Sequence, residues 1–576
     1  MATTETATAR RAAAYDPILL SVFSNRFMSI AEAMGRSLQQ TSISTNIKER
    51  LDYSCAVFAP TGDLVANAPF IPVHLGSMSF SVKHQLELHG PSLKPGDVLL
   101  TNSPTTGGSH LPDLTVITPC FSNTDSSKII FFTASRAHHS DIGGILPGSM
   151  PPTSTALFEE GAEIRSLKIV DGGIYDADGV YEALVTNPAS YPGCSGSRNF
   201  RDVESDLKAQ VAANHKGAEL LGALQSEYGL ETVQEYMEHI RSNAEQAVRD
   251  MLVRTAKRFG THLHAIDYLD DGSPINLTID IDEATGSAVF DFEGTGPELR
   301  GNLNAPVCVV NAAVIYCMRS MIGEDIPLNA GCLTPLDIRI PEGSLLSPSP
   351  TAAVCGGNVM TSQRITDVVL KAFNACAASQ GCCNNLSFGV GGKDPVTGEV
   401  TQGWGYYETI AGGSGAGPGW NGTSGVHVHM TNTRITDPEI LERRYPVILR
   451  EFNFRPGSGG EGAYKGGNGA VRTLQFLQSL QVSILSERRA RAPYGANGGS
   501  DAQTGLNLWV KAPRGDEASR KINIGGKGTV WFEAGDALEI HTPGGGGWGK
   551  GEGEVEQTGT QFEPRGRLAD AANVEF

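Results

Sequence analysis

The longest uninterrupted pattern in this chain of 576 residues is helical, and it lies between regions that carry the pattern of short strands. Residues 202–259 repeat apolar side chains at three- and four-residue spacings, which predicts two helices with a break at Tyr228-Gly229. Short apolar runs separated by turn residues fill 51–119, and Lys128–Ala134 is apolar enough for a strand buried on both faces. This succession of patterns predicts an α+β fold.

Glycine is the second feature that limits the fold, because the chain has 69 glycines. Beyond Gly381 they separate short apolar runs, which is typical of strands joined by tight turns. The runs that predict strands there are Val447–Phe454, Val482–Leu485, Leu506–Val510 and Gly528–Glu533. With an amphipathic helix predicted over 17–43, we expect mixed β-sheets with an N-terminal helix, a central helical hairpin and a β-rich, glycine-rich C-terminal lobe.

Two glycine-rich loops resemble phosphate-binding motifs but fail the test of context. GGGGWGKG places Gly551 where a nucleotide-binding P-loop needs Ser or Thr. GSGGEG, which begins at Gly457, has the spacing of a dinucleotide-binding turn, but no helix is predicted after it. We therefore expect no nucleotide site on this chain, and we interpret these loops as turns or close backbone contacts.

The charge balance excludes several classes of partner. The chain has 45 Lys and Arg against 63 Asp and Glu, a formal net charge of −18 at pH 7. Proteins that bind nucleic acid or anionic membranes need clustered basic residues, which the sequence lacks. It also has no run of 18 apolar residues, and its first residues lack the apolar segment of a secretory signal. We expect a cytoplasmic protein without nucleic-acid or membrane partners.

The densest polar pattern lies in the segments SHLPD and AHHSD. Each contains His-x-x-Asp at the edge of an apolar strand, so His110, Asp113, His138 and Asp141 could meet on one divalent ion, with His139 beside them. The alternative is structural: histidines that cap strand ends, and aspartates that form turns. Two copies 28 residues apart, each close to a Gly-Gly pair and a strand, favour a metal or catalytic site.

A second histidine pair, His427 and His429, lies in SGVHVHM. On a strand this spacing puts both imidazoles on one face, where they could join the same site or a substrate pocket. A half-exposed polar face is the equal alternative.

Several ordered blocks of the chain resemble one known family. They include LDYSCAVF, PFIPVHLGSM, TNSPTTGGSHLPDLTVITP, SRAHHSDIGGILPGSMPP, CGGNVMTSQRITDVV and HTPGGGGWG. These blocks are similar to the hydantoinase B/oxoprolinase family, and within it to the C-terminal half of eukaryotic ATP-dependent 5-oxoprolinases. We therefore expect 16–549 to form one hydantoinase B-type catalytic region, divisible into lobes 16–265 and 266–549. Residues 1–15 are predicted to be a disordered N-terminus and 550–576 a flexible tail.

The resemblance implies a hydrolase that opens a cyclic amide. In 5-oxoprolinases, ATP hydrolysis is coupled to opening of the 5-oxoproline lactam to give glutamate, and the nucleotide binds to a hydantoinase A-type half. ATP would then act only through that partner half, and a homo-oligomer is expected. The alternative, implied by hydantoinase and acetone carboxylase relatives, is a B subunit with a mainly assembling or channelling role.

The resemblance also implies a metal site. Members of the family carry a divalent metal in the B-type subunit, so His110, Asp113, His138 and Asp141 are the expected ligands of Mg, Mn, Zn or Fe. Several bacterial relatives have Asn-Asp-Pro where this chain has Asn102-Ser103-Pro104, which removes one carboxylate from this region.

Two further sets of residues take roles from the resemblance. The expected proton-transferring residues are His139, His427 and His429. The expected contacts of the substrate carboxylate are Arg136, Arg198 and Arg434. A guanidinium suits that task because its planar fork binds a carboxylate at two points, and a structural ion pair is the alternative for each arginine.

Overall fold

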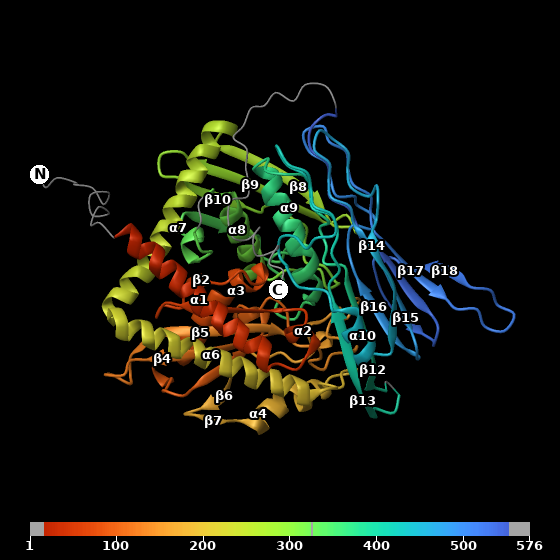
Figure 1. Ribbon diagram of the computed structural model, residues 1–576, viewed down its shortest axis with the longest axis horizontal. Helices are drawn as coiled ribbons and strands as arrows, with labels where there is room; N and C mark the ends of the chain where they lie inside the picture. Colours follow the sequence, from red (N-terminus) through yellow and green to blue (C-terminus); the bar gives the residue numbers. More distant parts are fainter. Residues whose placement is uncertain (1–15, 324–325, 395, 552–576) are drawn as a thin grey trace, which may run out of the picture.

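The computed structural model describes residues 16–323, 326–394 and 396–551, and within them helices pack against four β-sheets (Figure 1). The predicted disordered segment 1–15 and residues 552–576 of the predicted tail lie outside the described residues. The α+β fold class is confirmed. Among the described residues, no helix has the length and apolar character needed to cross a membrane.

The N-terminal half is built on a seven-stranded antiparallel sheet with the order β2-β1-β5-β4-β3-β6-β7. Its strands are β1 (Tyr53–Phe58), β2 (Leu64–Asn67), β3 (Val98–Thr101), β4 (Asp113–Phe121), β5 (Ile129–His138), β6 (Leu167–Asp171) and β7 (Ile174–Tyr175). In the central pair, Asp113 at the start of β4 lies opposite His138 at the end of β5. This register brings Asp113 and His138 together where β4 begins and β5 ends.

Helices cover both faces of this sheet, which explains why all of β1 and all of β5 after Ile129 are buried. Alternate residues of β1 face opposite ways: Cys55 and Val57 join the core beneath α1 (Pro17–Thr41), whereas Ala56 and Phe58 pack with α3 (Pro72–His89). The predicted N-terminal helix is confirmed, with Pro17 in its first turn and the Asp16 carboxylate accepting the Ile18 N–H at 2.8 Å.

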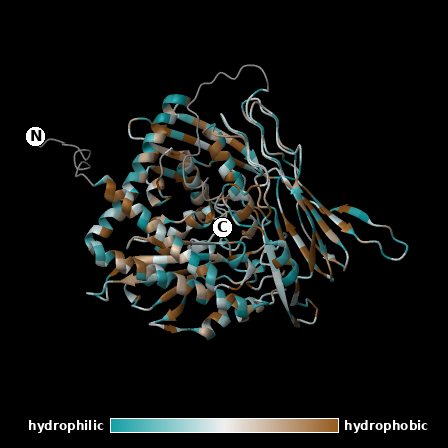
Figure 2. Ribbon diagram, viewed as in Figure 1, coloured by the Kyte–Doolittle hydropathy of each residue, from teal (hydrophilic) through white to brown (hydrophobic). Residues whose placement is uncertain are grey.

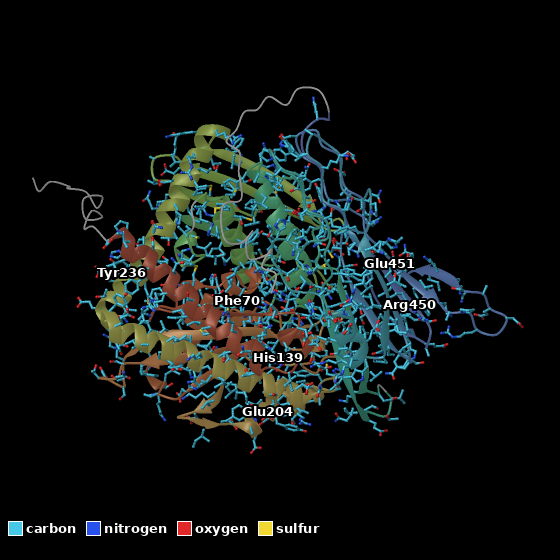
Figure 3. All side chains as sticks on the ribbon, viewed as in Figure 1. Phe70, His139, Glu204, Tyr236, Arg450 and Glu451 are labelled. Atoms are coloured by element: carbon cyan, nitrogen blue, oxygen red, sulfur yellow. The ribbon has the colours of Figure 1, made fainter. Side chains whose placement is uncertain are left out.

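The predicted helix break at Gly229 is confirmed, and the two helices diverge from it. Gly229 has φ +85°, which ends α6 (Phe200–Tyr228) and starts α7 (Leu230–Phe259). Helix α6 lies along the seven-stranded sheet, while α7 runs up towards a second sheet (Figure 1). Tyr236 of α7, labelled in Figure 3, stacks on Phe23 of α1 with ring centroids 4.6 Å apart.

The second sheet has the order β11-β10-β9-β8 and packs against buried helices. Its strands are β8 (His262–Tyr268), β9 (Pro274–Asp282), β10 (Ser287–Asp291) and β11 (Leu336–Arg339). The helices are α8 (Val307–Met321) and α9 (Ser362–Ala372), the latter entered through a π-helical turn, Gly357–Thr361. Residue 265, the proposed boundary between two lobes, lies inside β8.

The sequence patterns did not predict α3 or α8. Helix α8 is apolar on nearly all sides because it is buried, so it lacks the polar stripe by which amphipathic helices are recognised. The outer helices α6 and α7 carry many hydrophilic residues beside their hydrophobic ones (Figure 2).

The C-terminal part is β-rich, as predicted. One sheet, β13-β12-β16-β19, consists of β12 (Asn385–Lys393), β13 (Val400–Glu408), β16 (Leu480–Leu485) and β19 (Lys527–Phe532). The other, β14-β15-β20-β17-β18, consists of β14 (Val447–Phe454), β15 (Ala470–Phe476), β17 (Leu506–Lys511), β18 (Arg520–Asn523) and β20 (Ala537–His541).

Short helices lie between the larger elements along the chain. They are α2 (Thr45–Lys48), α4 (Ala177–Tyr181), α5 (Asn187–Ala189) and α10 (Pro438–Arg444).

The glycine-rich loops pack backbone against backbone. Gly545 N–H donates to Gly467 O, Gly467 N–H to Ser414 O, and Gly460 N–H to Gly545 O, each at 2.9 Å. A side-chain carbon on Gly466 would overlap the carbonyl oxygen of Gly545. Glycine is needed there for close approach, which supports the interpretation of these loops as backbone contacts.

Candidate functional site

Three buried side chains converge where β4 begins and β5 ends. His110 Nε2 lies 3.0 Å and His138 Nδ1 3.2 Å from Asp113 Oδ1, and the three residues offer ligand atoms that all lie within 4.8 Å of one another. His110 stands three residues before Asp113, and the strand register supplies His138. We call these three residues the His–Asp–His cluster.

The carboxylate oxygen at the centre of the cluster has no hydrogen-bond partner among the described residues. The two imidazole nitrogens lie close to it, yet neither approaches in hydrogen-bonding geometry. Buried oxygens are rarely left without a partner, because the loss of hydration is then uncompensated. Two imidazoles and one carboxylate that converge in this way are a donor set for a transition metal or zinc, whereas magnesium prefers oxygen ligands.

The second oxygen of the same carboxylate is held by other groups. Ser109 Oγ donates to Asp113 Oδ2 at 2.8 Å, and His74 Nε2 lies 3.1 Å from it. The other ring nitrogen of His74 lies 3.3 Å from Ser54 Oγ. These contacts fix the orientation of Asp113, as partners behind metal ligands do. His74 is not among the site residues predicted from the sequence, although it lies within the block PFIPVHLGSM.

Aromatic and amide groups complete the surroundings. The ring of His138 stacks on Tyr407 with centroids 4.3 Å apart and planes 14° from parallel. The Arg50 guanidinium lies 4.9 Å from the Tyr407 ring and donates to the Tyr407 carbonyl oxygen at 2.9 Å. The Asn358 amide, in the π-helical turn before α9, lies 3.1 Å from His110 Nε2. Tyr407 of β13 and Asn358 of the π-helical turn therefore contact the two imidazoles, and Arg50 supports Tyr407.

The charges of the cluster suit a metal ligand set. Burial by itself would raise the pKa of Asp113, but the charges of His110 and His74 outweigh it and hold that pKa well below its ordinary value. Burial lowers the pKa of His138, against the opposing effect of the Asp113 carboxylate. An ionised carboxylate and a neutral imidazole are the protonation states in which these side chains bind metals.

His139 and Asp141 take other partners. His139, labelled in Figure 3, places Nε2 2.9 Å from Gln210 Oε1 of α6, and burial lowers its pKa. Asp141 forms a buried ion pair with Arg198 at 3.1 Å and accepts the Gly143 N–H. Arg198 and Asp141 compensate each other's charge. This is the structural ion pair that was the alternative to substrate binding for Arg198.

The second histidine pair lies outside the strands, with His429 in a turn. His429 has φ +55°, in the left-handed region, so the alternation that would align it with His427 is broken. His429 Nε2 lies 3.3 Å from Asp367 Oδ1 of α9, and Nδ1 lies 3.5 Å from the Tyr316 hydroxyl. Burial and the nearby Arg50 charge lower the pKa of His427 to about 4. The two histidines therefore have different surroundings.

The other two arginines predicted to contact the substrate, Arg136 and Arg434, differ from each other in burial. Arg136 is buried on β5 and donates to Thr115 Oγ1, Ser77 Oγ, Ser81 Oγ and the Gly107 carbonyl. Arg434 is exposed. A role for either in substrate binding stays a prediction.

Fold and cluster together define an α+β protein with a buried two-imidazole, one-carboxylate site, and sequence comparison identifies its family. Residues 16–551 match the family described as hydantoinase B/oxoprolinase. The chain is 58% identical over 543 residues to an uncharacterized protein of Schizosaccharomyces pombe and 56% identical over 543 residues to the 5-oxoprolinase of Saccharomyces cerevisiae. The chain belongs to the hydantoinase B/oxoprolinase family, which confirms the resemblance.

The matches cover unequal shares of the proteins compared. They include 94% and 93% of this chain, but only 41% and 42% of the S. pombe and S. cerevisiae proteins. The chain thus spans about two fifths of the length of these relatives.

Two solved structures share the fold. The ATP-dependent caprolactamase from Pseudomonas jessenii has a TM-score of 0.80 at 23% identity, covering 97% of this chain and 94% of that chain. A nucleotide-free acetone carboxylase structure has a TM-score of 0.78 at 18% identity, covering 95% of this chain and 77% of that chain. At these identities the likeness establishes the fold.

Proposed function

We propose that this chain is the hydrolytic half of an ATP-dependent 5-oxoprolinase, which converts 5-oxo-L-proline, ATP and water to L-glutamate, ADP and phosphate. It would work with a hydantoinase A-type half that binds ATP and would be inactive without it. Support comes from the identity to a yeast 5-oxoprolinase and from the unmatched three fifths of that protein, which leave room for an ATP-binding half.

The observation that carries the proposal is the unpartnered Asp113 Oδ1 between two imidazoles in a buried site. His110, Asp113 and His138 would hold a divalent ion, with zinc, manganese or iron a better match than magnesium. Such an ion supplies Lewis-acid polarisation of a carbonyl and lowers the pKa of water towards about 7. His74 and Ser109 would keep the Asp113 carboxylate oriented for this task.

His429 is the histidine best placed to exchange a proton. Its contact with the Asp367 carboxylate favours one tautomer and orients the ring, as carboxylates do for catalytic histidines. Its segment adjoins the cluster, because Val73 N–H, next to His74, donates to the Met430 carbonyl at 3.4 Å. With its pKa lowered to about 4, His427 stays neutral near pH 7 and is a weak base.

The test is turnover of 5-oxo-L-proline with ATP, measured with and without the ATP-binding half, together with metal analysis of the purified chain. We expect turnover only when both halves are present, and about one divalent ion per chain. The His110→Ala/Asp113→Ala variant should lose the ion and at least about 1,000-fold in turnover.

The matched control is His262→Ala/Asp280→Ala, which removes an exposed His–Asp pair at 2.7 Å and should keep both properties. Full turnover by a metal-free chain would exclude a metal-dependent role and favour the assembling or channelling alternative. ATP-dependent turnover by the isolated chain would contradict the proposal that ATP binds to a separate half.

A further inference from the structure

A second polar site lies away from the His–Asp–His cluster. A cavity of about 590 Å³ opens between the β8–β9 turn, the segment after β16, and the β18–β19 turn. Its volume is within the range of small-molecule sites in proteins. Three cationic side chains line it: Arg455, Arg489 and Lys527. It shares no lining residue with the cluster.

The two arginines of the cavity contact only neutral acceptors within the described chain. Arg489 donates to Asn384 Oδ1 and to the Glu487 carbonyl at 2.7 Å, and to Asn507 Oδ1 at 3.0 Å. Its Nε has no partner among the described residues. These bonds hold the guanidinium in place without pairing it to a carboxylate, although the charges of Asp270 and Glu487 lie near enough to oppose the lowering of its pKa by burial.

Arg455 is held in the same way. Its Nη1 donates to the carbonyl oxygens of Thr504 and Thr542 at 2.7 and 3.1 Å, and its Nη2 to Gln503 Oε1 at 3.1 Å. Among the residues that the structure describes, no carboxylate lies within ion-pair distance of Arg455, Arg489 or Lys527. Fixed guanidiniums without a carboxylate partner are the usual binding groups for phosphate and carboxylate ligands.

The acidic residues of the cavity wall are engaged elsewhere. Asp270 accepts the N–H groups of Arg489 and Arg491 at 2.7 and 2.9 Å, so backbone donors occupy both of its oxygens. Glu487 Oε2 accepts the Asp270 N–H at 2.9 Å and lies 3.2 Å from Arg364, outside the cavity lining. Asp271 is exposed and accepts the Ser273 N–H at 2.8 Å. Asp270 and Glu487 thus bond to backbone donors and lie near Arg364, and neither forms an ion pair with the three cations of the cavity.

The cations also repel one another. Burial lowers the pKa of Arg455, and the charge of Arg489 lowers it further. Burial lowers the pKa of Arg489 as well. A bound anion would oppose both effects, because it would bring a negative charge into direct contact with the guanidiniums.

We propose that this cavity is a binding site for a small phosphate-bearing anion, held by Arg455, Arg489 and Lys527. None of the three cations has an ion-pair partner among the described residues, and a planar guanidinium can bind two phosphate oxygens at once. The cavity exceeds what one phosphate group fills, so an organic phosphate is expected to bind more tightly than inorganic phosphate. The site is independent of the proposed hydrolytic function.

The experiment is calorimetric titration of inorganic phosphate and of glycerol 3-phosphate into the full chain at constant ionic strength. We expect saturable binding of one equivalent, weakened by added salt, with glycerol 3-phosphate the tighter ligand. Arg455→Gln and Lys527→Gln should each weaken binding about tenfold, since each removes a charged contact. Arg489→Gln should weaken it more, but Arg489 also supports the wall, so the first two variants decide the result.

Arg520→Gln is the matched control, because Arg520 is an exposed cation on β18 outside the cavity lining and should not affect binding. Unchanged phosphate affinity in both Arg455→Gln and Lys527→Gln would overturn the proposal, as would the absence of saturable binding by the parent chain. Tighter binding of the dicarboxylate glutarate than of either phosphate ligand would overturn the assignment to phosphate.

Discussion

The molecule contains two buried charged clusters whose partners differ in kind. In the His–Asp–His cluster, the carboxylate faces imidazoles. In a second cluster, which we call the Arg–Asp network, carboxylates face guanidiniums. Its members are Asp267, Arg364, Asp367, Glu487 and Arg488, with Arg488 Nη2 2.8 Å from Asp267 and 2.9 Å from Asp367.

Because of this difference, the Arg–Asp network can stabilise the fold by itself, whereas the His–Asp–His cluster is suited to bind a ligand. A guanidinium is charged at every relevant pH, so the network compensates its carboxylates without a ligand and joins β8, α9 and the segment after β16. An imidazole can lose its proton, and in that neutral form it has a lone pair to offer a metal ion. The cluster is therefore left with an unpartnered carboxylate oxygen that the network does not have.

The largest effect on stability is expected from the network. Arg488→Met leaves Asp267 and Asp367 without this buried partner and should lower the free energy of unfolding by about 3–5 kcal/mol. Urea unfolding measures this, with exposed Arg520→Met as the control, expected within about 0.5 kcal/mol of the parent. The metal content should not change. A loss below about 1 kcal/mol would mean that the network is not a structural unit.

Asp113→Asn should reduce metal binding strongly and stability less than Arg488→Met does. The amide keeps the shape of the side chain but supplies no negative charge, so the affinity for a divalent ion should fall at least about 100-fold. Competition with a chromogenic zinc chelator measures this affinity. The metal-free variant should lose less unfolding free energy than Arg488→Met. Zinc binding equal to that of the parent would remove Asp113 from the proposed ligand set.

Another buried carboxylate, Glu160, contacts neither an imidazole nor a guanidinium among the described residues and sharpens the comparison. Burial raises its pKa to about 7, although Ser154 and the N–H groups of Val354 and Cys355 donate to it. Its stabilising contribution is complete below the unfolded pKa of about 4.5 and is lost as pH rises through about 7. Glu160→Gln does not titrate, so relative to the parent it should gain about 3 kcal/mol in unfolding free energy between pH 4.5 and pH 8. Parallel pH profiles of the two proteins in urea unfolding would contradict this.

His74→Gln tests the support behind the cluster. Loss of the imidazole that orients Asp113 should weaken metal binding about tenfold, less than loss of Asp113 itself. His84→Gln, on the same helix α3, is the control and should bind metal as the parent does. An effect of His74→Gln as large as that of Asp113→Asn would make His74 a ligand and not a supporting residue.

The smallest effect is expected at an exposed ion pair. Arg26 and Glu227 lie 2.7 Å apart with half of each side chain exposed, so Arg26→Gln should lower the free energy of unfolding by about 0.2–1 kcal/mol. A loss comparable to that of Arg488→Met would show that burial is not what distinguishes the network.

Local patterns predicted much of the fold and part of the site. The helix break at Gly229 and the strand Val447–Phe454 follow from spacing and turn residues within a few positions. His110 and Asp113 were found because they are three residues apart beside a strand. His74 was missed because its partner is 39 residues away in the sequence, and helix α8 because its burial removes the amphipathic pattern.

The sequence by itself determined the fold class, the family and the residue types available for chemistry, because these depend on local spacing and on ordered motifs. Tertiary structure decided which of these residues meet. The register of β4 on β5 brings His138 to Asp113, while Arg198 takes Asp141 away as an ion-pair partner. The physical reason is that side-chain contacts across a sheet depend on strand pairing and burial, which are properties of the whole chain.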